Sequence, residues 1–231
     1  MSKLSAILPP VHRLSPVAGA IHSLDDPRKV ALIVVDMQNF FVEAGQPLFG
    51  TYAPGVIAPI QGLIAAVRAG GGGVVWLRQT WSDQPGKAAP RWADDLRGAR
   101  RVAQVRALSP GTHAHAIYSA FQVAPADLVI DKYRFSAFTP DHAGLDATLR
   151  ARGIDTVIVA GVLTNFCCQS TARDAMMLDY RVLMPPDASA AADDRLHNAT
   201  LVDLGNMGQF DLRTTPGLIA ELERATISGT R

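Results

Sequence analysis

The chain has 231 residues, of which 48% are hydrophobic and 19% are charged, and its 22 Lys and Arg nearly balance its 21 Asp and Glu. This length suits one domain with an ample core, the composition excludes a disordered chain, and the balanced charge offers no basic surface to nucleic acid or anionic membranes. The longest apolar runs are far shorter than the roughly 18 residues that span a bilayer. We therefore expect a globular protein with no nucleic acid and no membrane among its partners.

The two cysteines, Cys167 and Cys168, are neighbours in the sequence, so no disulfide framework is possible. Prolines and Arg13 interrupt the apolar stretches of the first 24 residues, which disfavours an export signal. These features favour a cytoplasmic protein, with an organelle transit peptide as the minor alternative. We interpret residues 1–27 as an N-terminal extension and residues 28–231 as a single domain.

From about residue 29 onward, short apolar runs alternate with longer amphipathic stretches. Five runs predict strands, at residues 31–35, 74–77, 128–130, 157–160 and 182–184. Apolar residues at helical spacing predict a helix over 56–67, and Thr-Pro pairs at 139–140 and 215–216 predict the starts of two more helices. Because these strands are apolar throughout, both of their faces must be covered. The pattern predicts a three-layer α/β/α fold with a parallel sheet.

Two segments between these elements are candidates for functional loops. The glycine run 70–73 ends a predicted helix and precedes a strand, which is the opposite order to a dinucleotide-binding loop, so a simple turn is favoured. Residues 80–126 contain several prolines and glycines and are predicted to be irregular. Loops of that length are often functional.

Three residues whose side chains can act as an acid, a base or a nucleophile follow predicted strands: Asp36, Lys132 and Cys167. In parallel sheets, ligands bind beyond the carboxyl ends of the strands, so these side chains are predicted to meet there. Each alone has a plainer interpretation, as a cap or ion-pair partner, a solvated charge and a small core residue. Together, a thiol in the first turn of a helix beside an ammonium and a carboxylate describes a cysteine hydrolase, with the thiol pKa expected to be low.

The segments ALIVVDMQNFF, DKYRFSAF and GVLTNFCCQSTARDA resemble, in order and separation, the three signature blocks of the isochorismatase-like cysteine hydrolases, over roughly residues 28–225. The resemblance assigns an Asp-Lys-Cys triad to Asp36, Lys132 and Cys167. Cys168 falls at a position that is normally aliphatic, and we interpret it as a core residue. The resemblance also implies a Rossmann-like, six-stranded, mainly parallel sheet of order 3-2-1-4-5-6, and a homo-oligomer, either a dimer or a tetramer.

The same resemblance implies a mechanism without a metal or cofactor. Cys167 attacks an amide or ureido carbonyl, Asp36 carries the proton, and Lys132 holds both charges in place. Ammonia or an amine leaves, and water then hydrolyses the thioester. The resemblance further implies a non-proline cis peptide between Val162 and Leu163, and an oxyanion hole formed by the backbone N–H groups of Leu163 and Cys167.

Two departures narrow the choice of substrate within this family. Nicotinamidases carry a His-rich metal segment after the second strand, whereas RQTWSDQPGK has no histidine. Members that hydrolyse the isochorismate vinyl ether typically lack the cysteine. The remaining resemblance is to ureidoacrylate and carbamoyl amidohydrolases, which carries substrate contacts over to Gln79, Trp81 and Phe135. For Trp81 and Phe135, simple packing is an equally good interpretation.

The other polar residues receive plainer interpretations. Gln38 and Asn39 are expected to orient Asp36. His113 and His115 lie close together in the sequence but lack a third ligand nearby, so no metal site is predicted. Arg91, Arg97, Arg100, Arg101 and Arg106 predict a solvated or subunit-contacting face, with one of them as a candidate partner for a substrate carboxylate. The alternative to an enzyme is an idle oligomeric scaffold, which the retention of all three triad residues disfavours.

Overall fold

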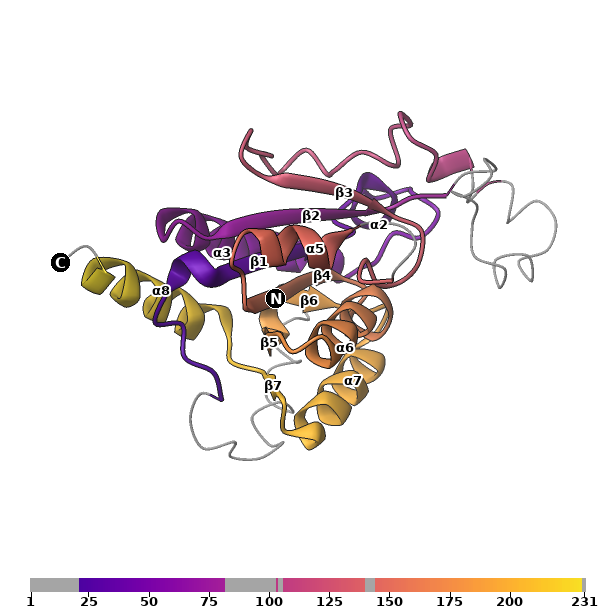
Figure 1. The fold of residues 1–231 in the computed structure, drawn as a ribbon. Coiled ribbons are helices and arrows are strands. Elements are labelled where there is room, and N and C mark those ends of the chain that lie inside the picture. The colour runs from indigo at the N-terminus through magenta and orange to yellow at the C-terminus, as the bar shows by residue number, and fades with distance from the viewer. Residues whose placement is uncertain (1–20, 82–102, 104–105, 140–143, 230–231) are drawn as a thin grey trace.

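A computed structural model describes residues 21–81, 103, 106–139 and 144–229 of the chain. Within these residues, seven strands form one parallel sheet (Figure 1). The strands are β1 (Val30–Val35), β2 (Gly73–Gln79), β3 (Leu128–Lys132), β4 (Thr156–Val162), β5 (Arg181–Leu183), β6 (Ser189–Ala190) and β7 (Phe210–Asp211). The helices are α2 (Asn39–Val42), α3 (Ile57–Ala69), α5 (Leu145–Ala151), α6 (Gln169–Met177), α7 (Asp194–Met207) and α8 (Thr215–Gly229).

Short turns of tighter or wider helix join these elements. The 3-10 turns are η2 (Pro27–Lys29), η3 (Ala53–Val56) and η6 (Pro186–Ala188), and a π-helical turn, η5 (Thr164–Cys168), follows β4. This π-helical turn runs directly into α6, so Cys167 lies just before the α-helix that the sequence predicts around it.

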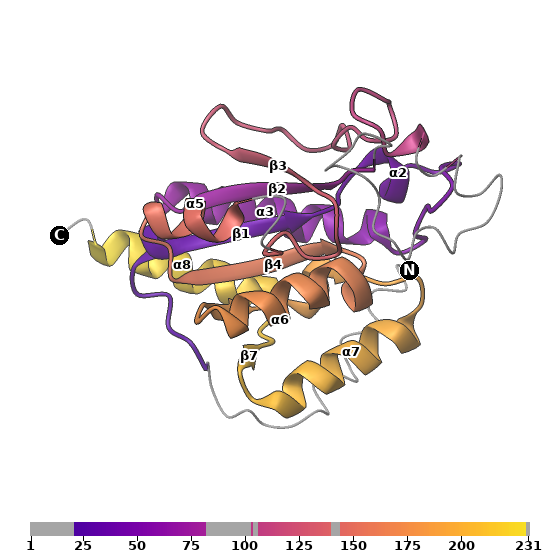
Figure 2. The same ribbon diagram turned by 45° about the vertical axis from the view of Figure 1, so that its right-hand side comes forward.

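The sheet separates two apolar cores, and β1 supplies both of them. Leu32 and Val34 face the core that α3 and α8 cover, whereas Ile33 and Val35 face the core that α5 and α6 cover. All four side chains are fully buried. Alternate side chains of a strand point to opposite faces, so an uninterrupted apolar run fits a strand between two helix layers. Figures 1 and 2 show α5 and α6 on the near side of the sheet and α3 behind it.

The strand order is β3-β2-β1-β4-β5-β7, and the two-residue strand β6 also pairs with β4. The expected α/β/α fold and the expected order of six strands are confirmed, with β6 as a short addition. The expected cis peptide between Val162 and Leu163 is present.

The glycine run is a helix-to-strand turn, between the end of α3 at Ala69 and the start of β2 at Gly73. A Cβ atom on Gly72 would lie 2.7 Å from the carbonyl oxygens of Pro27 and Val30. The close approach of these backbones therefore explains why a side chain is excluded at this position.

The helix predicted to start at the Thr139-Pro140 pair begins later, at Leu145. Gly144 precedes it with φ 58°, a left-handed conformation that a right-handed helix cannot continue through. Residues 140–143 lie outside the described part of the chain. The helix predicted from the second Thr-Pro pair does begin at Thr215.

The packed chain extends upstream of residue 28. Leu24 is 1% exposed and belongs to the core under α3 and α8, and its backbone N–H donates to Glu221 Oε1 at 2.8 Å. Residues 1–20 of the expected N-terminal extension lie outside the described residues.

Candidate active site

The carboxyl ends of the first three strands in the sheet bring their terminal polar residues to one edge. Asp36 follows β1, while Gln79 and Lys132 end β2 and β3 and are directly paired in register. On the other side of β1, Val35 is paired with Gly161, three residues before the start of the turn that carries Cys167. The parallel pairing of these strands thus brings four distant sequence segments together in one site.

The backbone at the end of β1 is unusual, and it brings β4 close. Asp36 has φ 52°, a left-handed conformation that is uncommon for a residue with a side chain. Opposite it, a Cβ atom on Gly161 would lie 2.1 Å from the Val35 carbonyl oxygen. Only glycine permits this approach of β4 to the turn that aims the Asp36 side chain.

Lys132 joins the site from the far side of β2. Its Nζ lies 2.8 Å from Asp36 Oδ2 and 3.3 Å from Cys167 Sγ, and it donates to Gln79 Oε1 at 2.7 Å. Both Lys132 and Asp36 are fully buried. The Asp36 charge also raises the pKa of the Cys167 thiol, so the two groups are close neighbours. The three side chains therefore form one contiguous group in which a proton can pass between sulfur and carboxylate.

Burial dominates the electrostatics of this group. Burial raises the pKa of Asp36, and the Lys132 ammonium opposes that shift. Burial alone would lower the pKa of Lys132, but the adjacent Asp36 carboxylate and Cys167 sulfur raise it, so the amine stays charged. Burial, and next the Asp36 charge, raises the pKa of Cys167 well above that of an ordinary thiol. The expectation of a low-pKa thiol is therefore wrong, because desolvation outweighs the neighbouring ammonium.

Cys168 has a different environment from its neighbour. Its side chain has no solvent-accessible surface and packs in the core beneath α5 and α6. Both cysteines are free thiols. This agrees with the interpretation of Cys168 as a core residue.

The three residues expected to contact substrate divide into different environments. Gln79 accepts from Lys132 and so belongs to the charged group itself. Trp81 is 6% exposed and packs in the core under α3. Phe135 is half-buried and packs against Phe166, with ring centroids 5.4 Å apart.

Phe166 was not singled out from the sequence. It immediately precedes Cys167 and is 44% exposed, which is unusual for a large aromatic side chain. Together with Phe135 it forms an aromatic pair beside the reactive group. The only signal in the sequence was its position inside the TNFCC segment.

Gln38 ties the strand ends together instead of contacting the Asp36 carboxylate. Its Oε1 accepts from the Gln79 backbone N–H at 2.8 Å, and its Nε2 donates to the carbonyl oxygens of Gln79 and His115 at 3.1 and 2.8 Å. Asn39 similarly donates to the His113 carbonyl oxygen at 2.8 Å. These residues position Asp36 indirectly, by holding the segment 113–115 against the ends of β1 and β2.

The two loop histidines have separate partners. His113 Nε2 lies 2.7 Å from Glu43 Oε2, and His115 Nε2 lies 2.8 Å from Thr80 Oγ1. Among the described residues, no group of three His, Cys, Asp or Glu side chains could hold a metal ion. Arg106 is exposed, and the other four arginines of the predicted basic face, Arg91, Arg97, Arg100 and Arg101, lie outside the described residues.

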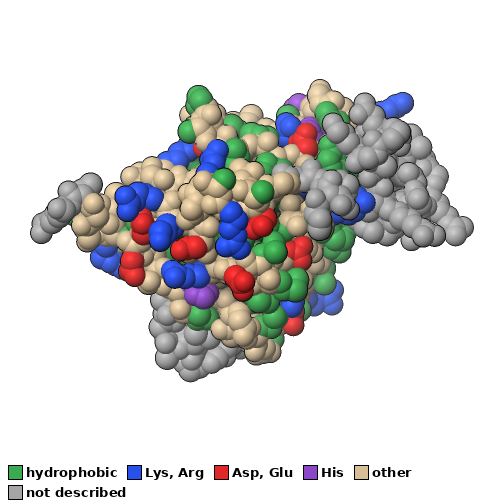
Figure 3. All heavy atoms as spheres, in the orientation of Figure 1, with side chains coloured by type: hydrophobic (Ala, Val, Ile, Leu, Met, Phe, Trp, Pro, Cys, Tyr) green, Lys and Arg blue, Asp and Glu red, His purple; other side chains and the backbone are tan. Residues whose placement is uncertain are grey.

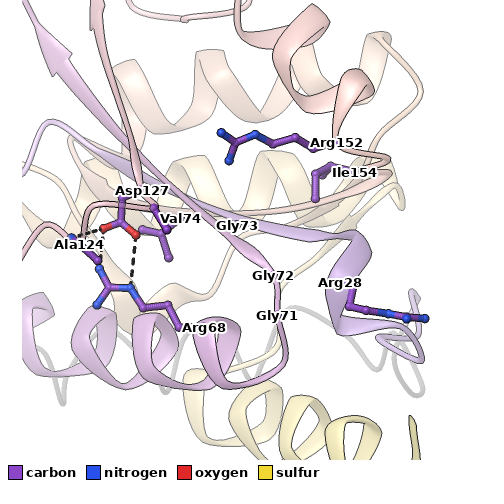
Figure 4. A pocket seen from close by; sticks show the side chains of 11 residues that line it. Arg28, Arg68, Gly71, Gly72, Gly73, Val74, Ala124, Asp127, Arg152 and Ile154 are labelled. Atoms are coloured by element: carbon purple, nitrogen blue, oxygen red, sulfur yellow. Dashed lines mark hydrogen bonds and ion pairs between the residues drawn. The ribbon is translucent and has the colours of Figure 1, made fainter. Parts of the chain in front are cut away.

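A separate pocket of about 510 Å³ lies at the opposite end of the sheet, at the amino ends of the strands (Figure 4). The glycine turn lines it together with Arg28, Arg68, Asp127 and Arg152. Figure 4 shows Arg68 turned toward Asp127, with which it pairs at 2.5 Å. None of the triad residues contributes to this pocket, so it has no part in the chemistry of Cys167.

In the described part of the chain, no helix has both the length and the apolar character needed to cross a bilayer. Figure 3 shows Lys and Arg interspersed with Asp and Glu over the face in view, which agrees with the near-zero net charge.

Known proteins share both the sequence pattern and this fold. The isochorismatase domain family matches residues 30–213. The ureidoacrylate amidohydrolase RutB of Methylobacterium radiotolerans is 36% identical over 193 residues, which cover 78% of this chain and 74% of the relative. A crystal structure of a cysteine hydrolase from Pseudomonas syringae pv. phaseolicola 1448A is similar with a TM-score of 0.80 at 28% identity, over 90% of this chain and 99% of that one. N-carbamoylsarcosine amidase from Thermoplasma acidophilum is similar with a TM-score of 0.66 at 26% identity, over 81% and 96% of the two chains. The chain therefore belongs to the isochorismatase family.

Proposed function

We propose that this chain is a cysteine-dependent amidohydrolase that cleaves a C–N bond in a small amide or ureido substrate. The observation that carries the proposal is the position of Lys132 Nζ, 2.8 Å from Asp36 Oδ2 and 3.3 Å from Cys167 Sγ in a fully buried setting. A buried charged group next to a thiol at the carboxyl edge of a parallel sheet is typical of a functional site.

In the proposed mechanism, the resting thiol keeps its proton, because burial raises the pKa of Cys167. As sulfur attacks the carbonyl carbon, the proton passes to Asp36, whose raised pKa makes it a stronger base than an ordinary carboxylate. Lys132 stays charged and stabilises the negative charge that moves between sulfur and carboxylate. The backbone N–H groups of Leu163 and Cys167 are proposed to stabilise the oxyanion.

The tetrahedral intermediate then collapses. The C–N bond breaks, the leaving nitrogen takes the proton from Asp36, and a thioester on Cys167 remains. Water attacks the thioester carbonyl, Asp36 accepts one water proton, and the sulfur leaves as the acid product forms. Transfer of that proton from Asp36 to sulfur restores the starting thiol.

Two observations support amide or ureido substrates over other carbonyl compounds. The relative from Methylobacterium radiotolerans is a ureidoacrylate amidohydrolase, and the similar structure from Thermoplasma acidophilum is an N-carbamoylsarcosine amidase. Beside Cys167, the Phe135 and Phe166 rings offer an apolar face to a flat, conjugated amide or ureido group. Gln79 is proposed to orient the substrate through its contact with Lys132.

A panel of substrates tests this proposal. Ammonia release is measured from ureidoacrylate, N-carbamoyl amino acids, maleamate and nicotinamide, with the Cys167→Ala variant as the control. We expect turnover of a ureido or carbamoyl compound, and an acyl adduct on the Cys167 peptide after acid quenching. Turnover that persists in Cys167→Ala, or hydrolysis without any thioester, would exclude the cysteine mechanism.

A further inference from the structure

A buried histidine outside the reactive group contacts the turn that carries Cys167. His197 lies in the first turn of α7, and its Nδ1 is 2.8 Å from Thr164 Oγ1. Neither His197 nor Thr164 has any solvent-accessible surface. Thr164 is the first residue of the π-helical turn, and Cys167 is its fourth. The hydrogen bond therefore links α7 to the start of the turn, 33 residues away in the sequence.

The hydrogen-bonding capacity of the two groups indicates which of them donates. Within the described residues, His197 Nε2 has no partner, and Nδ1 is the partner of the Thr164 hydroxyl. If Nδ1 carried the proton, both the hydroxyl hydrogen and the Nε2 lone pair would be buried without partners. If the Thr164 hydroxyl donates to Nδ1, only the Nε2 hydrogen is without a partner. The second arrangement leaves fewer unmade hydrogen bonds, and it requires a neutral imidazole.

The turn is held from two sides. At its end, Lys132 Nζ reaches Cys167 Sγ at 3.3 Å. At its start, the Leu163 carbonyl oxygen accepts from the backbone N–H groups of Phe166 and Cys168 at 3.1 and 3.2 Å. The hydroxyl of Thr164 bonds this turn to α7, and just after the turn Gln169 also donates to Asp203 of α7. A displacement of about 1 Å in a reacting atom can lower a rate about 100-fold. Loss of the hydrogen bond to Thr164 is therefore expected to lower the reaction rate if it lets Cys167 shift.

We propose that His197 is a positioning residue for Cys167, and that it acts by accepting the Thr164 hydroxyl hydrogen bond at Nδ1. The inference rests on the proposed role of Cys167 as the nucleophile. Burial lowers the pKa of His197 to about 4, which keeps the ring neutral and Nδ1 free to accept near neutral pH. His197 touches neither Lys132 nor Asp36 in this arrangement, so its effect passes through the turn.

Side-chain shape supplies matched variants for the test. His197→Asn puts a carbonyl oxygen near the position of Nδ1, whereas His197→Leu fills the space without an acceptor. Thr164→Ser keeps the hydroxyl, whereas Thr164→Val removes it at nearly the same volume. We expect His197→Leu and Thr164→Val each to lower kcat about 10- to 100-fold with little change in KM. His197→Asn and Thr164→Ser should recover most of that loss, and the double variant His197→Leu/Thr164→Val should be no slower than either single variant.

A second readout separates this inference from the proposed function. The rate of Cys167 alkylation by iodoacetamide, followed by peptide mapping, needs no substrate and should change in the same order across the variants. If the substrate panel shows no amidase activity, the alkylation rates still decide the inference. Equal loss in His197→Asn and His197→Leu, additive losses in the double variant, or unchanged alkylation in Thr164→Val would each overturn it. Should His197→Leu fail to fold, the Thr164→Val and Thr164→Ser pair gives the same decision.

Discussion

The two ends of the sheet each hold a buried carboxylate paired with a cation, yet the two pairs differ in what surrounds them. At the carboxyl end, Asp36 pairs with Lys132 at 2.8 Å, and the side chains are 1% and 0% exposed. At the amino end, Asp127 pairs with Arg68 at 2.5 Å, and the side chains are 3% and 34% exposed. Both carboxylates are thus removed from water, and burial alone does not distinguish a reactive group from a structural one.

The difference lies in the chemistry of the partners. Asp127 Oδ2 also accepts from Trp76 Nε1 and from the Ala124 backbone N–H, both at 2.9 Å. Indole, amide and guanidinium groups do not give up protons in the physiological range. Asp36, by contrast, contacts an ammonium and a thiol. A buried carboxylate held by groups that keep their protons is structural, whereas one held by groups that exchange protons can take part in a reaction.

The largest expected effect separates the two cysteines at the carboxyl end. Cys167→Ala should lower turnover at least about 1,000-fold, because the sulfur that forms the covalent intermediate is lost. Cys168→Ala should leave kcat largely intact, since this side chain packs in the core, whereas it is the Cys167 sulfur that accepts from the Lys132 amine. Steady-state kinetics of both variants, with iodoacetamide labelling of the wild type, measures this. Preferential alkylation of Cys168 with loss of activity would reverse the assignment.

The second prediction breaks each ion pair in turn. Lys132→Met should cost about 3–5 kcal/mol in the free energy of unfolding if Asp36 stays ionised, because a buried charge loses its partner. Arg68→Met should cost about 1 kcal/mol, since Arg68 is partly exposed and Asp127 keeps its other donors. Urea unfolding measures both free energies.

The two single variants should also differ in catalytic activity. Lys132→Met should abolish turnover, and Arg68→Met should not change it. The double variant Asp36→Asn/Lys132→Met should regain stability without regaining activity, because the uncompensated charge is gone. Equal losses of stability from the two single variants would contradict the distinction between the two ends of the sheet.

A third prediction concerns the pH dependence of stability. Burial lowers the pKa of His197 from its ordinary 6.5 to about 4. The unfolded state therefore binds a proton at a higher pH than the folded state does, so stability is full above about pH 6.5 and falls as the pH drops toward about 4. The total contribution is about 3 kcal/mol. His197→Asn, which cannot titrate, should lose less stability over this range in urea unfolding, and parallel losses in both proteins would refute the prediction.

The last prediction is that removing metal ions has no effect on the reaction rate. EDTA should leave the rate unchanged, because the segment after β2 that carries metal-binding histidines in nicotinamidases has none in this chain. Metal analysis of the purified protein, before and after chelation, checks this. Stoichiometric zinc that is lost together with activity would overturn the metal-free mechanism.

Much of the fold could be predicted because its signals are local. The apolar run at residues 31–35 and the Thr-Pro pair at 215–216 depend on neighbours in the sequence, and both predicted elements are present. The start of α5 could not be predicted, since the left-handed conformation of Gly144 competes with the Thr-Pro signal at 139–140. The strand order came from resemblance to a family, because strand pairing is not a local property.

The site was predictable in its members but not in its electrostatics. Asp36 and Lys132 could be found because carboxyl ends of parallel strands meet at one edge. The high pKa of Cys167 depends on burial by segments far apart in the sequence, which no spacing reveals. For the same reason, the contact between His197 and Thr164 was missed, and so were the bonds to the Gln79 backbone through which Gln38 positions Asp36.

Because Lys132 lies on β3, the proposed activity depends on a strand at the edge of the sheet remaining paired. β3 ends the strand order and pairs through its backbone with β2 alone among the described strands, and Val129, its second residue, is 41% exposed. Edge strands with few buried contacts open by local unfolding at a lower free energy than central strands do. A brief detachment of β3 would withdraw the ammonium while the central strands stay folded. We therefore expect heat to inactivate this protein below its melting temperature, and reversibly, with amide hydrogen exchange fastest along this strand.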